Sequence, residues 1–204
     1  MQTKFDNHEG KYQLAEVPDP SEKYTYADYL QWKFTERLEL INGRIFRTSA
    51  PNTLVQKTYA RIIIQLYTAL SNTKFKVFHA PFDVRLPVIN NSKDNEITTV
   101  VQPDICAVSN GSIIDGRGCC GVPDFVIEIL SPGSTSHDIQ AKFDLYQGAG
   151  IPEYWLINPA EKDVIVYNTI SDGQFTEGRQ YNGKDIIRSI ILNGFTIAVA
   201  DIFK

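Results

Sequence analysis

Glu128 stands in a part of the sequence where a charge is unexpected. It lies within the run FVIEIL, whose other members are all apolar, so the pattern predicts a central strand covered on both faces. Burying an unpaired carboxylate in such a strand costs several kcal/mol. A neighbouring cation would give Glu128 a structural role, whereas a metal ion or a raised pKa would give it a functional one. Glu128 is therefore the first candidate for chemistry.

Asp104 supplies a second carboxylate. The segments 104–108 and 125–130 have the pattern of strands, and the loop between them contains DGRGCCG. If the two strands form an antiparallel pair, the register that sets Asp104 opposite Glu128 is centred on Gly116, inside that loop. Two carboxylates so close favour a shared divalent cation. The connection also permits a different strand order, and Asp104 alone could simply begin a strand or cap a turn.

Lys142 is the candidate cation for this pair. It lies in a predicted helix, at the edge of a buried stripe that consists of Ile139, Phe143 and Tyr146. Because this helix directly follows FVIEIL, its first turns should pack near the end of that strand, so Lys142 could reach the carboxylates. The alternative is a solvated pair between Lys142 and Asp138, which lies four residues earlier.

Three helices are predicted to position these residues. The first runs from Tyr26 to about Phe34 behind a cap at Thr25, and the second runs from about Asn52 to Leu70. The third runs from the cap Thr135 to about Gln147 and stops at Gly148.

Strands account for most of the remaining sequence. The segment RLELINGRIFR predicts a hairpin, because Asn42-Gly43 is the strongest short signal for a tight primed turn. Further strands are predicted at KFKVFH, FDVRLPV, VVQPDICAV, FVIEIL, YWLI, DVIVY, QFTEGRQY and FTIAV. This order of elements indicates an α/β or α+β domain with a mixed sheet. We expect a loose arm at residues 1–24 and a single domain at residues 25–204.

Composition narrows the class of protein. The chain has 204 residues, 43% of them hydrophobic, which is typical of a globular domain and excludes a disordered or fibrous chain. It holds no stretch apolar enough to cross a membrane and begins without a secretory signal. Three cysteines are an odd number, so we expect reduced thiols and a cytoplasmic location. A net charge of -4 argues against a protein that coats nucleic acid through bulk charge.

Four motifs together resemble a known family. ELINGRI, PDICAV, PDFVIEILSPGS and DIQAKFDLYQGAGIPEYWLINP occur in the order found in the Uma-type restriction endonucleases, which belong to the PD-(D/E)XK nuclease superfamily. The resemblance covers about residues 22–170. It implies a restriction-endonuclease-like α/β core, with a mixed central sheet flanked by helices, and metal-dependent cleavage of nucleic acid.

The resemblance also implies roles for individual residues. Asp104 corresponds to the metal-binding aspartate of the superfamily, and Glu128 to the acid of its E-x-K motif. Glu39 corresponds to a third acid, although it could equally be a solvent-facing residue of the hairpin. The lysine position of E-x-K holds Leu130, and the lysine function is expected from the next helix, at Lys142.

The implied cofactor is Mg²⁺ or Mn²⁺. Asp104, Glu128 and the backbone carbonyl of Ile129 would hold it, and Lys142 would orient the attacking water or offset negative charge at phosphorus.

Candidate phosphate contacts lie upstream. Between residues 37 and 61 the only anion is Glu39, whereas five residues are basic: Arg37, Arg44, Arg47, Lys57 and Arg61. For Lys57 and Arg61, four residues apart, a solvated helix face is the alternative.

The leading hypothesis is a metal-dependent DNA endonuclease that acts as a homodimer and does not associate with membranes. One rival is a non-catalytic binding or regulatory module that keeps the nuclease fold, which the leucine at position 130 favours. Hydrolysis of another phosphate-containing substrate is a further possibility.

Overall fold

The computed structural model describes residues 18–32, 37–48, 50–87, 92–170 and 172–204, and the backbone of two short strands at 3–4 and 13–14. The chain divides into two compact units. The first comprises residues 1–48 and 87–101, and the second comprises residues 49–86 and 102–204. Within the described ranges, no helix combines the length and the apolar character needed to cross a bilayer.

The first unit contains the predicted hairpin. Strand β3 (Leu38–Ile41) pairs with β4 (Arg44–Arg47) in antiparallel fashion. The two turn residues, Asn42 and Gly43, have φ values of 53° and 80°, as a type I′ turn requires. A third strand, β7 (Val100–Val101), pairs with β3 on its other side, so β3 is central among these three strands.

The first predicted helix is shorter than expected. The helix α1 (Tyr26–Tyr29) begins at Thr25 in a capping box with Asp28, as predicted. It ends early because the amides of Gln31 and Trp32 donate to carbonyls three residues back, which replaces the helical pattern with turns. The rest of the predicted helix lies outside the described residues. Of the predicted arm, the structure describes residues 18–24 and the pairing of β1 (Thr3–Lys4) with β2 (Gln13–Leu14).

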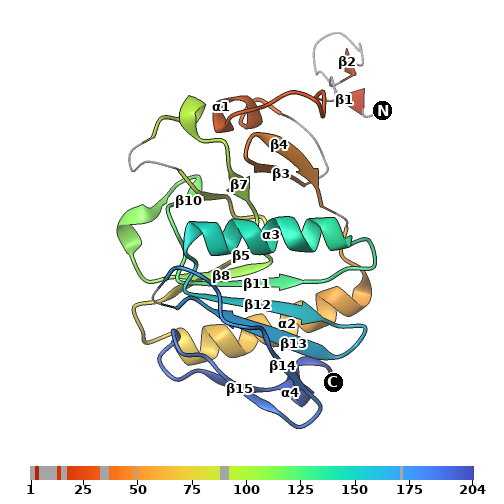
Figure 1. Cartoon of the computed structure of the whole chain (residues 1–204), viewed down its shortest axis with the longest axis vertical. Helices are drawn as coiled ribbons and strands as arrows, with labels where there is room; N and C mark the ends of the chain where they lie inside the picture. Colours follow the sequence, from red (N-terminus) through yellow and green to blue (C-terminus); the bar gives the residue numbers. More distant parts are fainter. Residues whose placement is uncertain are drawn as a thin grey trace. The chain divides into compact units, whose positions relative to one another are not determined.

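The second unit is built on a six-stranded mixed sheet (Figure 1), in the order β14-β13-β12-β11-β8-β5. Only β11 and β12 are parallel neighbours; the other pairs are antiparallel. The predicted mixed central sheet is thereby confirmed. The strands are β5 (Lys76–His79), β8 (Ile105–Val108), β11 (Phe125–Ile129), β12 (Glu153–Asn158), β13 (Asp163–Asn168) and β14 (Arg179–Asn182).

Two helices cover the two faces of this sheet (Figure 1). The helix α2 (Thr53–Leu70) forms the hydrophobic core with one face, to which the sheet contributes Ile105, Ala107, Phe125, Ile127 and Trp155. The helix α3 (Ser136–Ala149) packs its aromatic side chains against the other face, where Phe143 meets Tyr167 at 5.0 Å between ring centroids. Because side chains alternate along a strand, each strand contributes to both layers.

The third predicted helix is longer than expected. Instead of stopping at Gly148, α3 continues to Ala149 and ends at Gly150, which adopts the left-handed conformation with φ of 74°. A glycine inside a helix costs only about 1 kcal/mol, whereas the left-handed cap strongly favours glycine, so the second glycine terminates the helix.

The connection from β8 to β11 contains two short strands. Strand β10 (Gly118–Cys120) pairs with β9 (Ile114–Asp115) and with β6 (Val84–Arg85). The backbones approach closely here, since a Cβ on Gly118 would lie 2.2 Å from the carbonyl oxygen of Asp83. The prediction of one continuous strand over VVQPDICAV is wrong, because β7 and β8 are separate strands. Pro103 lies between them and has no backbone N–H to donate to a neighbouring strand.

The second unit ends in a hairpin and a short helix. Strand β15 (Ile186–Arg188) pairs with β16 (Thr196–Ala198), and α4 (Val199–Ile202) follows.

Candidate active site

The two predicted carboxylates lie opposite each other at the ends of β8 and β11. In this antiparallel pair Val126 faces Cys106, and continuing the register by two residues sets Asp104 opposite Glu128, as predicted. Asp104 lies just before β8, and its Oδ2 accepts a hydrogen bond of 2.8 Å from the backbone N–H of Ile129. The side chain of Asp104 thus extends the ladder where its own strand has ended.

Lys142 reaches Glu128. Its Nζ lies 2.7 Å from Oε1 of Glu128, and the two side chains are only 16% and 12% exposed. The predicted partner cation is therefore present. Asp138, the alternative partner, instead accepts a 2.7 Å hydrogen bond from the hydroxyl of Thr135 in the cap of α3.

Tyr146 contacts the same carboxylate. Its hydroxyl donates a hydrogen bond of 2.6 Å to Oε1 of Glu128, the oxygen that Lys142 also contacts. Lys142 and Tyr146 are four residues apart, so one face of α3 carries both. The sequence placed Tyr146 only in the buried stripe. The available signal was its spacing from Lys142, together with the need of a buried phenol for a polar partner.

Tyr154 lies beside this group on β12. It is 1% exposed, and its ring lies 5.1 Å from that of Tyr146. Burial holds the pKa of Tyr154 well above its usual value, and the negative charges of Glu128 and Asp104 raise it further. On the helix α2, burial raises the pKa of Tyr59 to about 12, and the negative charge of Asp104 makes a smaller contribution. Both phenols therefore stay protonated at neutral pH.

Glu39 belongs to the first unit. It lies on β3 opposite Phe46 and is 1% exposed, so the solvent-facing alternative is wrong. Its role as a third acid remains a prediction. Among the described residues, no group of three or more His, Cys, Asp or Glu side chains is gathered for a metal ion.

The five candidate phosphate contacts are divided between the units. Arg44 and Arg47 are exposed at the two ends of β4, and Arg37 is half-buried just before β3. In the second unit Lys57 is exposed on α2. Arg61 is half-buried there and donates to the carbonyl of Ile202 at 3.5 Å, which gives it a structural role at the end of α4.

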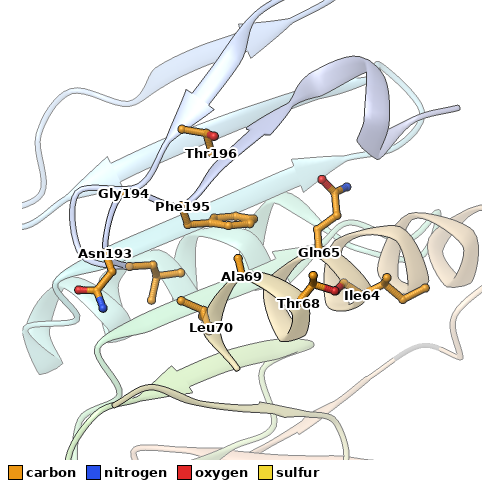
Figure 2. A pocket seen from close by; sticks show the side chains of 10 residues that line it. Ile64, Gln65, Thr68, Ala69, Leu70, Asn193, Gly194, Phe195 and Thr196 are labelled. Atoms are coloured by element: carbon orange, nitrogen blue, oxygen red, sulfur yellow. The ribbon is translucent and has the colours of Figure 1, made fainter. Parts of the chain in front are cut away.

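A separate cavity of about 450 Å³ lies between the C-terminal half of α2 and the turn from β15 to β16 (Figure 2). None of the candidate site residues lines it. Its walls include Ile64, Gln65 and Thr68 on the helix and residues 192–196 on the turn, and they carry no ionisable side chain. The cavity therefore offers none of the chemistry expected of the carboxylate pair.

Known proteins resemble this chain in sequence and in fold. The profile of the Uma2 family, described as "Putative restriction endonuclease", matches residues 26–200, which confirms the predicted resemblance. No curated protein matches the chain. A crystal structure from Anabaena variabilis, described as "a putative nuclease belonging to DUF820", superposes with a TM-score of 0.70 at 18% identity. The superposition covers 88% of this chain and 97% of that one, so the two share a fold.

Proposed function

The chain belongs to the Uma2 family, and from this membership we propose that it is a metal-dependent endonuclease that hydrolyses phosphodiester bonds in DNA. The observation that supports the proposal most is the juxtaposition of Glu128 on β11 with Asp104, which directly precedes the neighbouring strand β8. A structural ion pair would need only Glu128 and Lys142. Asp104 adds a second negative charge, which a divalent cation would offset.

The donor atoms at this point fit Mg²⁺. The ion prefers oxygen ligands and is usually held by one or two carboxylates while it keeps several waters. The N–H of Ile129 faces Asp104, and the N–H and C=O of one residue in an extended strand point to the same side. The Ile129 carbonyl would therefore be available as a third oxygen ligand beside the two carboxylates. Mg²⁺ or Mn²⁺ held there would lower the pKa of a bound water and neutralise charge on a phosphate oxygen.

Lys142 supplies the positive charge that the usual lysine position lacks. Leu130 cannot do so, whereas the ammonium group of Lys142 contacts Glu128 from α3. An ammonium group has three protons, so Lys142 can hold Glu128 and still donate to an attacking water or to a phosphate oxygen. Such a donor stabilises the negative charge that develops at phosphorus.

DNA is the proposed substrate, and the family description supports it. Arg44 and Arg47 are exposed and would contact phosphates, as would Arg37, Lys57 and Arg61. We also propose a cytoplasmic homodimer. Twofold assemblies are the commonest oligomers, and the three free cysteines fit a reducing compartment. Sedimentation equilibrium would test the dimer.

A plasmid cleavage assay tests the proposed function. Supercoiled DNA is incubated with Mg²⁺ or Mn²⁺ and with the wild type, Asp104→Asn or Glu128→Gln. We expect nicking by the wild type that EDTA abolishes, and a loss of at least about 100-fold in each variant, as for other groups that act on the transition state. Asp144→Asn is the matched control, because Asp144 is an exposed carboxylate on α3 that contacts only Gln140 among the bonds described. Equal nicking by all four proteins would refute the proposal.

A non-catalytic module with the same fold is the second candidate, and Leu130 in the usual lysine position favours it. The same proteins separate the two functions when Mn²⁺ binding is measured by calorimetry. A degenerate site would neither bind Mn²⁺ through Asp104 and Glu128 nor cut DNA.

A further inference from the structure

Two donors converge on one oxygen of Glu128. The phenol of Tyr146 lies 2.6 Å from Oε1, and the ammonium of Lys142 lies 2.7 Å from it. The two oxygens of a carboxylate together offer about four lone-pair sites, two on each. Both sites of Oε1 are therefore occupied by hydrogen-bond donors from α3.

The phenol is held in this contact by its surroundings. Tyr146 is fully buried, and its ring packs against that of Tyr154 at 5.1 Å. If the hydroxyl turned away from Glu128 it would lose a short hydrogen bond to a charged group, which is about twice as strong as a neutral one. The surroundings of Tyr146 therefore favour its hydrogen bond to Oε1 of Glu128.

We infer that Tyr146 is a positioning residue for the proposed metal site: with Lys142 it saturates Oε1 and fixes the plane of the Glu128 carboxylate, so that Glu128 binds a divalent cation through Oε2. The inference rests on the proposed function. Carboxylates that bind metals are commonly held by hydrogen bonds from outer groups, and loss of such a group lowers metal affinity about 10- to 100-fold.

The test compares two single hydroxyl deletions. Tyr146→Phe keeps the ring and removes the donor to Glu128. Tyr167→Phe is the matched control, because its ring belongs to the same aromatic cluster, 5.7 Å from that of Tyr154 and 5.0 Å from that of Phe143. Thermal unfolding without metal establishes that both variants fold.

Mn²⁺ affinity without DNA is the main measurement, and calorimetry or electron paramagnetic resonance gives it directly. We expect the Mn²⁺ dissociation constant to rise about tenfold in Tyr146→Phe and to stay at the wild-type value in Tyr167→Phe. In cleavage assays the Mn²⁺ concentration for half-maximal rate should rise by the same factor, while the rate at saturating Mn²⁺ changes less. A purely structural role for Tyr146 would not produce this split.

The outcomes separate the inference from the proposed function. An unchanged Mn²⁺ affinity in a folded Tyr146→Phe variant overturns the inference and leaves the nuclease proposal standing. If the wild type binds Mn²⁺ but cuts no DNA, the nuclease proposal fails, and the affinity of Tyr146→Phe still decides the role of Tyr146. A wild type that binds no Mn²⁺ overturns both.

Discussion

Two glutamates on neighbouring strands of the six-stranded sheet are held in different ways. Glu128 on β11 is held by the charged Lys142 and the phenol of Tyr146. Glu153 on β12 is fully buried. Among the residues that the structure describes, its hydrogen-bond donors are all neutral: the indole of Trp155, the hydroxyl of Ser189 and the amides of Ile190 and Ile191. Glu153 thus fastens the segment before β16 to the sheet, and its oxygens are used within the fold.

Glu153 should make the stability of the protein depend on pH. Burial raises the pKa of Glu153, although its hydrogen bonds oppose the shift. The unfolded chain therefore releases this proton at a lower pH than the folded protein, so the contribution of Glu153 to the free energy of unfolding falls as the pH rises from about 4 through the raised pKa. Denaturant titrations of the wild type and Glu153→Gln between pH 4 and 7 measure the effect. We expect the free energy of unfolding of the wild type, relative to that of Glu153→Gln, to fall as the pH rises. Free energies of unfolding that change in parallel in the two proteins would contradict the assignment.

Replacing Tyr154 with phenylalanine should stabilise the protein. Its hydroxyl is buried, and within the part of the chain that the structure describes it has no hydrogen-bond partner. An unsatisfied buried polar group costs about 1–3 kcal/mol, so Tyr154→Phe should raise the free energy of unfolding by about 1 kcal/mol. The urea midpoint at unchanged slope measures this. Tyr67→Phe is the control with the opposite expected sign, because the hydroxyl of Tyr67 donates to the carbonyl of Val77 at 3.0 Å. A loss of stability in Tyr154→Phe would show that a bound water satisfies the hydroxyl.

At the scale of elements, the pairing of β8 with β11 was one of the strand orders that the sequence permitted. A register centred on Gly116, inside the glycine-rich loop, sets Asp104 opposite Glu128, although the length of the connection also allowed another order. The connection then forms strands of its own, yet the register holds because a slip by one residue would turn Glu128 toward the core on the α2 face. A polar residue in an apolar strand therefore carried information about pairing as well as chemistry.

Other features depend on contacts that no local pattern contains. Thr25 signalled where α1 begins, but no residue signalled where it ends. Gly148 and Gly150 could each have ended α3. The helix ends at Gly150 because this residue adopts the left-handed conformation. The role of Tyr146 was missed because its partner lies 18 residues away on another element. Lys142 had two possible acidic partners in the sequence, and tertiary packing brought it to Glu128.

At the scale of the whole molecule, the net charge of -4 hides an uneven distribution. Arg44 and Arg47 are both exposed, on a strand that carries no acidic residue. This arrangement suits phosphate contacts, because each neutralised phosphate releases counterions and makes binding depend on salt.

The double variant Arg44→Ala/Arg47→Ala should bind DNA more weakly than the wild type, by a similar factor for all DNA sequences. We expect the slope of log K against log salt to become shallower by about 2, since each lost phosphate contact removes roughly 0.9. Fluorescence anisotropy at several salt concentrations measures the slope. Lys184→Ala/Arg188→Ala removes the same charge from exposed positions in the second unit and should keep the wild-type slope. Equal slopes in all three proteins would show that Arg44 and Arg47 do not contact DNA.

The six-stranded sheet separates two tasks by its faces. The face toward α2 carries the hydrophobic core, and the face toward α3 carries Glu128 and its partners beside an aromatic cluster. Substitutions of Asp104, Glu128 or Lys142 therefore fall outside the hydrophobic core on the α2 face, and substitutions that loosen that core need not change these charged groups. A related protein that has lost the carboxylates at positions 104 and 128 could therefore still fold and could evolve another function. Shared architecture is thus inherited more durably than shared reactivity, and relatives of the same shape must be compared at positions 104, 128 and 142 before an activity is transferred among them.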